Sequence, residues 1–276
     1  MPRFKTSDNL SLHYTDQGTG HPLLCLPGLT RCGRDFDFFA PHARDLRLIT
    51  LDYRGRGQSD YDPSYANYNV VQESCDVIEL LDHLGLERVS ILGTSRGGLI
   101  AMVLAATHAH RLSGVTLNDV GPEISADGIT RILTYVGKPP SSRTIDQAAR
   151  ALCDAMAPQF PDVPLSRWQQ QAEIQYNETH DGLALRYDPL LAQALQDQAA
   201  SGETPDLWPL FDALAVGPLG VIRGENSDIL SSETLAEMQR RNPGLLICEI
   251  PNRGHVPFLD EAPAIDLIHT ITEMSR

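Results

Sequence analysis

Six short apolar runs, separated by segments with helical periodicity, constrain the fold of this 276-residue chain more than any other feature. Gly, Pro, Asn or Asp residues bound each run, which is typical of strands buried in a parallel sheet. The runs span residues 23–26, 48–51, 89–92, 115–117, 220–222 and 245–250. Because such strands alternate with helices, the sequence predicts a doubly wound α/β domain with a mostly parallel sheet.

Two of the segments outside these runs show the helical pattern clearly. Each places apolar residues three and four positions apart, and Gly85 ends the first one as a helix C-cap. The apolar positions are Val77, Leu80, Leu81 and Leu84 in the first segment, and Ala264, Leu267, Ile268 and Ile271 in the second.

Residues 121–214 interrupt the alternation, because this stretch has helical patterns but no convincing strand. One helix is expected to end at Gly137, a second to begin at Thr144 in a capping-box pattern, and a third to run from Asp188 to about Gly202.

An excursion that leaves one strand end and returns before the next strand lies over the carboxyl ends of the sheet, where α/β ligand sites occur. We therefore expect a helical cap. The predicted organisation is a first part of the core domain at residues 1–120, the cap at residues 121–214, and a second part of the core at residues 215–276.

Charge and composition narrow the function classes. Lys and Arg number 22 against 36 Asp and Glu, so the formal net charge is −14. An acidic chain repels phosphate backbones and anionic lipid surfaces, so we expect neither nucleic acid nor a membrane as partner. The sequence has no stretch of 18 apolar residues, so we expect no transmembrane helix, and residues 1–20 lack the apolar core of a signal peptide.

The five cysteines fit neither a disulfide framework nor a zinc site, because their number is odd, they are scattered, and no C-x-x-C pair occurs. We expect buried thiols in a reducing cytoplasm. The residues are Cys25, Cys32, Cys75, Cys153 and Cys248.

The motif that carries chemistry is Gly93-Thr94-Ser95-Arg96-Gly97, which follows the strand at residues 89–92 and precedes a helical run. A nucleophile on a sharp strand-to-helix turn needs small neighbours, so that its Oγ projects from the sheet. The two glycines supply that space. Ser95 is therefore the predicted nucleophile, and the alternative is that it only caps the following helix.

A serine nucleophile needs a base, and the base needs an acid that orients it. His255 follows the strand at residues 245–250, and Asp228 follows the strand at residues 220–222, so both lie in loops at strand carboxyl ends. We predict the order Ser95, Asp228, His255. Asp119, at the end of the strand at residues 115–117, and Glu225 are alternative acids.

At these residues the sequence resembles the small capped members of the α/β-hydrolase superfamily, such as carboxylesterases and enol-lactone hydrolases. The resemblance spans nearly the whole chain. It rests on Leu26-Pro27-Gly28, on the segment Asp52 to Asp60, on the Ser95 motif, on Gly224 to Asp228 and on Gly254-His255. It implies the α/β-hydrolase fold, the roles given above for Ser95, Asp228 and His255, and an oxyanion hole formed by the backbone N–H groups of Leu29 and Arg96. In some members the acid follows the earlier strand, where Asp119 lies here.

Several arginines lie close to these motifs. The resemblance implies a structural role for Arg54 and Arg56. Arg31, Arg34 and Arg96 map near one cleft of an acidic protein, so one hypothesis is that they bind a substrate carboxylate. The alternative is that they pair with internal acids such as Asp35 or Asp37.

The sequence contains no dinucleotide-binding, phosphate-binding or zinc-protease motif, and we expect no cofactor and no metal. His108 and His110 are expected to be solvated at a helix end rather than to bind metal. The predicted function is hydrolysis of a small carboxylic ester or lactone through an acyl-enzyme on Ser95. The alternatives are hydrolysis of a carbon–carbon bond in a vinylogous diketone, acyl transfer, or a receptor on the same fold that binds a small molecule without turnover.

Overall fold

The computed structural model describes residues 2–200 and 205–276. Within these residues an eight-stranded sheet has the order β1-β2-β4-β3-β5-β6-β9-β10. The pairs β1/β2 and β2/β4 are antiparallel and all the others are parallel. The strands are β1 (Arg3–Lys5), β2 (Ser11–Gln17), β3 (His21–Leu26), β4 (Leu46–Leu51), β5 (Val89–Thr94), β6 (Leu112–Asn118), β9 (Leu219–Gly224) and β10 (Leu246–Ile250).

The six apolar runs of the sequence coincide with six of these strands, which confirms the predicted parallel sheet. Strands β1 and β2 were not predicted. They form the antiparallel edge of the sheet, and β2 carries the polar residues Thr15, Asp16 and Gln17, so it lacks the continuous apolar signal of a central strand.

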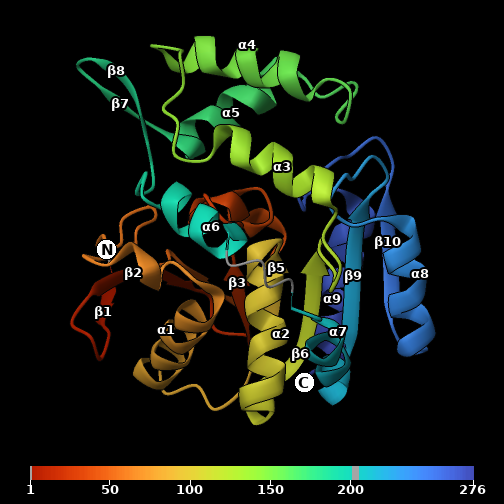
Figure 1. Cartoon of the computed structure of the whole chain (residues 1–276). Coiled ribbons are helices and arrows are strands. Elements are labelled where there is room, and N and C mark those ends of the chain that lie inside the picture. Colours follow the sequence, from red (N-terminus) through yellow and green to blue (C-terminus); the bar gives the residue numbers. More distant parts are fainter. Residues whose placement is uncertain (1, 201–204) are drawn as a thin grey trace.

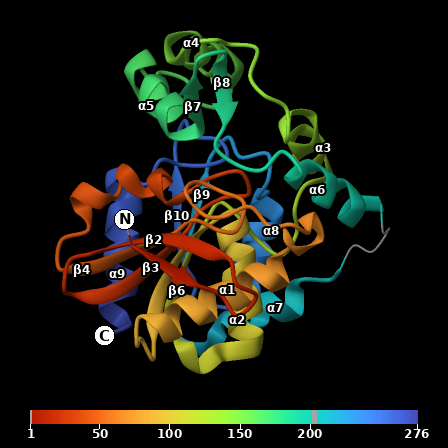
Figure 2. The same cartoon turned by 90° about the vertical axis from the view of Figure 1, so that its left-hand side faces the viewer.

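Helices cover both faces of the sheet (Figures 1 and 2). One face packs against α1 (Val70–His83), α2 (Arg96–His108), α7 (Trp208–Asp212) and α8 (Ser232–Arg241), and the other against α9 (Ala262–Met274). The two helices with clear apolar periodicity in the sequence, α1 and α9, thus lie on opposite faces.

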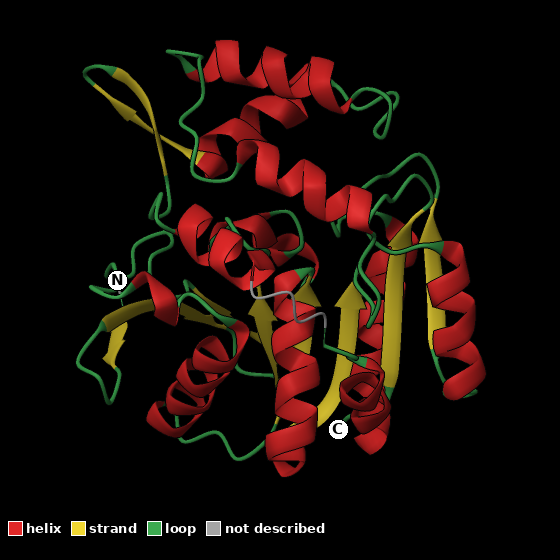
Figure 3. Cartoon of the chain, viewed as in Figure 1, coloured by secondary structure: helices red, strands yellow, loops and turns green. Residues whose placement is uncertain are grey.

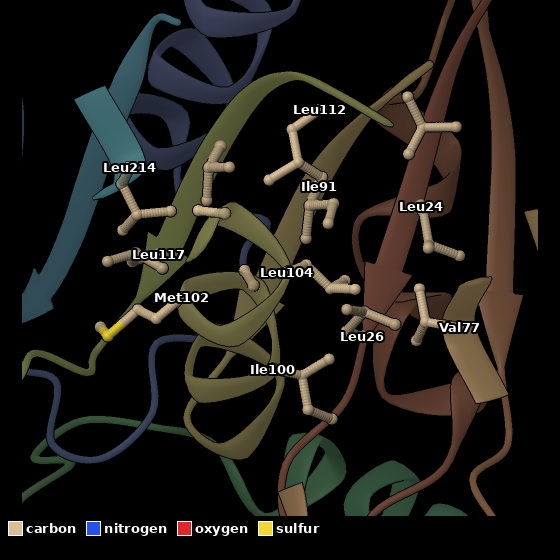
Figure 4. Packing of buried hydrophobic residues seen from close by; sticks show 14 of the residues in the cluster. Leu24, Leu26, Val77, Ile91, Ile100, Met102, Leu104, Leu112, Leu117 and Leu214 are labelled. Atoms are coloured by element: carbon tan, nitrogen blue, oxygen red, sulfur yellow. The ribbon is translucent and has the colours of Figure 1, made fainter. Parts of the chain in front are cut away.

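The larger core cluster lies between α2 and the central strands, as Figure 4 shows. Burial of each Leu or Ile side chain here contributes about 2 kcal/mol, so this cluster fixes α2 on the sheet. The labelled members from these elements include Leu24, Leu26, Ile91, Ile100, Met102, Leu104, Leu112 and Leu117.

The predicted helical excursion lies above the carboxyl ends of the parallel strands, towards which the arrowheads in Figure 3 point. We call the elements from α3 to α6 the cap. They are α3 (Ala126–Tyr135), α4 (Ile145–Met156), α5 (Leu165–Gln175), the hairpin strands β7 (Tyr176–Thr179) and β8 (Gly182–Leu185), and α6 (Leu191–Ala200).

The predicted starts and ends of the cap helices are confirmed in part. Thr144 accepts the N–H of Gln147 and so caps α4, and Gly137, with φ +78°, follows the end of α3. The helix expected from Asp188 begins at Leu191, and its expected end at Gly202 lies outside the described residues. Helix α5 and the β7/β8 hairpin were not predicted.

The last part of the predicted cap segment belongs instead to the core. Helix α7 packs against α2, and Phe211 and Leu214 are buried in the main core cluster. Their burial shows that the chain has returned to the sheet before Leu214, the expected boundary.

The cysteines are all free in the structure. Cys25 and Cys32 are buried as expected, whereas Cys75 is exposed, and Cys153 and Cys248 are partly buried. Burial raises the pKa of the Cys32 thiol to about 12. Among the described residues, no helix is long and apolar enough to cross a membrane.

The crossing of β3 and α2 leaves no room at Gly97. A Cβ atom there would lie 2.1 Å from the carbonyl oxygen of Leu26. We expect Gly97→Ala to lower the free energy of unfolding by about 1 to 3 kcal/mol, because overpacking forces the backbone to shift. Urea denaturation measures this change.

Gly244→Ala is the matched control, since its Cβ would meet only the Asn242 side chain at 3.4 Å. Equal midpoints for the two variants would contradict the packing argument.

Candidate active site

Ser95 occupies the turn between β5 and α2 in a strained backbone conformation, with φ 49° and ψ −111°. Positive φ is uncommon for a residue with a side chain and here marks a sharp turn. The Ser95 N–H donates to the carbonyl of Asn118 (3.0 Å), which ties the turn to β6. The serine side chain lines a cavity beneath the cap.

His255 connects Ser95 to a buried carboxylate. Its Nε2 lies 3.0 Å from Ser95 Oγ, and its Nδ1 lies 2.7 Å from Asp119 Oδ2. The Asp119 side chain is fully buried and that of His255 is 13% exposed. With Nδ1 protonated, the imidazole donates to Asp119 and accepts from the serine hydroxyl, so the three side chains form one hydrogen-bond chain.

The prediction that Asp228 contacts His255 is wrong, because Asp119 occupies that position. Strands β6 and β9 are neighbours, so the loops after both strands reach the same end of the sheet. Spacing within the sequence did not distinguish them. Asp228 forms an ion pair with Arg131 of α3 (2.7 Å) instead, and Glu225 accepts the N–H of Asn252.

The loop after β9 still takes part in the site, through a residue that the sequence analysis missed. Ser227 Oγ donates to Asp119 Oδ2 (2.7 Å), and the Gly224 N–H donates to Asp119 Oδ1 (2.9 Å). Together with His255, these groups give the buried carboxylate three hydrogen bonds, so both of its oxygens have partners. No sequence motif marks Ser227.

The expected oxyanion donors, the N–H groups of Leu29 and Arg96, lie on the two segments that flank Ser95. Helix α2 begins at Arg96, and the first N–H groups of a helix have no partner within it. Leu29 lines the cavity with Ser95, and Arg56 Nε donates to the Leu29 carbonyl (3.0 Å), which fixes the orientation of this loop.

Two of the three arginines proposed to bind substrate face elsewhere. The Arg96 guanidinium pairs with the buried Glu73 (2.5 Å), and Arg34 pairs with Asp37 (3.2 Å) on the surface. Arg31 does line the cavity. Its guanidinium lies 3.5 Å from Asp35, so the alternative of an internal acid partner holds for all three.

Arg54 and Arg56 are structural, as the resemblance implied. Arg54 is fully buried and pairs with Asp62 and Asp76, while Arg56 pairs with Glu73 at 2.8 Å.

The cavity above Ser95 has a volume of about 390 Å³ and lies between the core and cap helices α3, α4 and α5. Its apolar lining comes mainly from the cap, and its polar groups include two residues of α3 that the sequence analysis did not identify. The lining includes Arg131, Ile132, Tyr135, Leu152, Ala155, Met156, Trp168, Tyr176 and Val256.

The Arg96–Glu73 pair predicts a stability effect. Arg96→Met leaves Glu73 with Arg56 alone, and removal of one partner from a buried ion pair costs about 3 kcal/mol. We expect that loss in urea denaturation. Arg34→Met is the control, because its exposed pair contributes less than about 1 kcal/mol. An unchanged stability of Arg96→Met together with weaker binding of carboxylate ligands would return Arg96 to the binding site.

Comparison with known proteins agrees with this architecture. A curated relative, the 3-hydroxybutyrate-oligomer hydrolase of Cupriavidus necator, is 36% identical over 257 residues, which cover 90% of this chain and 87% of the relative. The crystal structure of an alpha/beta hydrolase from Novosphingobium aromaticivorans superposes with a TM-score of 0.90 at 40% identity and covers 99% of this chain and 97% of the other.

The fold extends to more distant proteins. The crystal structure of E-2-(acetamidomethylene)succinate hydrolase has a TM-score of 0.81 at 23% identity, with 99% of this chain and 97% of the other covered. The family model for the alpha/beta hydrolase fold matches residues 21–262. The chain therefore belongs to the α/β-hydrolase family and is a hydrolase.

Proposed function

We propose that the protein is a serine hydrolase that cleaves a small carboxylic ester through an acyl-enzyme on Ser95. The observation that carries the proposal is the hydrogen-bond chain from Ser95 Oγ through His255 to Asp119, with distances of 3.0 and 2.7 Å. A serine hydroxyl is a weak nucleophile, and an oriented imidazole is the standard way to activate it.

In the proposed reaction, Ser95 Oγ attacks the ester carbonyl while His255 Nε2 takes the hydroxyl proton. The imidazolium then gives this proton to the departing alkoxide, so that an alcohol leaves and an acyl-enzyme remains. Water attacks the acyl group with His255 again as the base, and the acid product leaves. Asp119 stabilises the imidazolium throughout, since its carboxylate is buried next to Nδ1.

The N–H groups of Leu29 and Arg96 are the proposed donors to the oxyanion that forms in each step. Loss of one such donor lowers kcat by roughly 10²- to 10³-fold in comparable sites. Both donors are on fixed backbone, one held by Arg56 and one at the start of α2, so little reorganisation is needed when charge develops.

The substrate class follows from the cavity and from the relative. A volume of about 390 Å³ with a largely apolar lining suits a small acyl group, and the relative named for 3-hydroxybutyrate oligomers acts on a compound whose units are joined by esters. We propose short esters of this size as substrates. A lactone is an internal ester and passes through the same steps. The expected location of the protein is the cytoplasm.

Replacement of the nucleophile tests the mechanism. Ser95→Ala is expected to abolish hydrolysis of p-nitrophenyl butyrate and labelling by a fluorophosphonate probe, because it removes the attacking oxygen. Mass spectrometry of the labelled wild-type protein should locate one adduct, on Ser95. Persistent labelling of the alanine variant would place the nucleophile elsewhere.

The identity of the acid has its own test. Asp119→Asn is expected to lower kcat by about 10⁴-fold, because the imidazole loses the charge that orients and stabilises it. Asp228→Asn should lower kcat on the same neutral ester by less than tenfold, since Asp228 contacts Arg131 and not His255. Steady-state kinetics of the two variants decide between the acids, and the reverse ranking would restore Asp228.

A further inference from the structure

The cavity above Ser95 has a mainly apolar lining that also contains two positively charged side chains. Two arginines, Arg31 and Arg131, line it, one from the core loop after β3 and one from cap helix α3. In a protein with a net charge of −14, a cleft with two cations is a specific feature, and cations in a cleft attract anionic ligands.

Arg31 is satisfied by its neighbours. Asp35, which also lines the cavity, lies 3.5 Å from Arg31, and the side-chain oxygen of Gln175 accepts from both terminal nitrogens of Arg31 when its amide is oriented accordingly. Desolvation raises the pKa of Asp35, and the charge of Arg31 acts against this shift. Within the cavity this cation and this carboxylate offset each other.

Arg131 differs from Arg31 in where its carboxylate partner lies and in how many of its N–H groups have an acceptor. Its carboxylate partner, Asp228, belongs to the loop after β9 and is not among the described residues that line the cavity. Asp228 occupies only Nη2, and Gln159 accepts a long hydrogen bond from Nη1 (3.4 Å). The Nε–H has no partner among the described residues. Of the five N–H donors of the guanidinium, Asp228 and Gln159 accept one each and the Nε–H is buried, so one N–H on each terminal nitrogen remains available.

Tyr135 is a further polar residue of this cavity. It lies one helical turn after Arg131 and lines the same cavity. Desolvation raises the pKa of its phenol, and the positive charges of Arg31 and Arg131 act against this shift. The phenol is a further hydrogen-bond donor among the residues that line the cavity.

We infer that Arg131 is a specificity-determining residue that binds a carboxylate of the ester substrate, with the scissile carbonyl at Ser95 and the carboxylate beneath α3. This inference rests on the proposed function and names the substrate class as an anionic ester. Asp228 and Gln159 each accept one N–H at the terminal nitrogens, and the second N–H of each terminal nitrogen is left for the two oxygens of a carboxylate.

The carboxylate belongs either to the alcohol part of the ester or to the acyl part. Two matched substrate pairs separate these cases. The first pair is the linear dimer of 3-hydroxybutyrate and the same dimer capped as a primary amide, which differ in charge on the alcohol side. The second pair is mono-p-nitrophenyl glutarate and p-nitrophenyl valerate, which differ in charge on the acyl side.

The experiment measures kcat/KM for each pair in the wild type, Arg131→Met, Arg131→Lys and the control Arg150→Met, all at one ionic strength. Arg150 is an exposed arginine of α4 that is absent from the cavity lining. We expect the ratio of charged to neutral substrate to fall at least tenfold in Arg131→Met for one of the two pairs. Arg131→Lys should recover part of that ratio, and Arg150→Met should keep it.

An unchanged ratio for both pairs in Arg131→Met would overturn the inference, as would an equal fall in Arg150→Met. A binding measurement separates this failure from failure of the proposed function. The Ser95→Ala protein is titrated calorimetrically with the 3-hydroxybutyrate dimer, and Ser95→Ala/Arg131→Met should bind it at least tenfold more weakly. That result would support the carboxylate site even if the wild-type protein hydrolysed none of the four esters, which would refute only the proposed hydrolysis.

Discussion

The position of the Asp119 carboxylate is the constraint on which the site depends. A fully buried charge is costly unless its hydrogen-bonding capacity is filled, and Asp119 accepts from His255, Ser227 and the Gly224 N–H. These donors come from the last residue of β9, the loop after it and the loop after β10, while Asp119 itself follows β6. One carboxylate therefore joins the ends of three adjacent strands and sets the orientation of the imidazole.

Buried carboxylates organise the other side of the site in the same way. Glu73 of α1 pairs with both Arg56 and Arg96, so it links the loop after β4 to the first residue of α2. Asp52 accepts the N–H groups of Gly33 and Gln58 and thereby holds the loops after β3 and β4 together. Asp52 and Glu73 are buried, so these acidic residues are structural rather than part of a surface for partners.

The sequence was sufficient for the features that depend on local patterns. Apolar runs predicted the six strands from β3 to β10 in the main sheet, and the Ser95 motif predicted the turn because its glycines are needed where β5 crosses to α2. The predictions that failed concern contacts between residues that are far apart in the sequence. Asp119 and Asp228 follow two neighbouring strands of the same sheet, and only the packing of the loops shows that the first contacts His255 while the second pairs with Arg131. The partner of Arg96 was likewise settled by packing, since Glu73 lies on a different element, whereas the partner of Arg34 is Asp37, only three residues away and already among the alternatives from the sequence.

The loop after β9 shows how the core and the cap come to depend on each other. Two consecutive residues of this loop contact different parts of the protein. Ser227 donates to Asp119 of the core, and Asp228 pairs with Arg131 of the cap. A shift of α3 that pulled on Asp228 would act on the residue next to the one that supports the acid. The five-residue stretch from Gly224 to Asp228 thus supports both the hydrogen-bond chain of the active site and the proposed carboxylate site. This sharing gives a physical reason for an aspartate at position 228 although it does not contact the histidine.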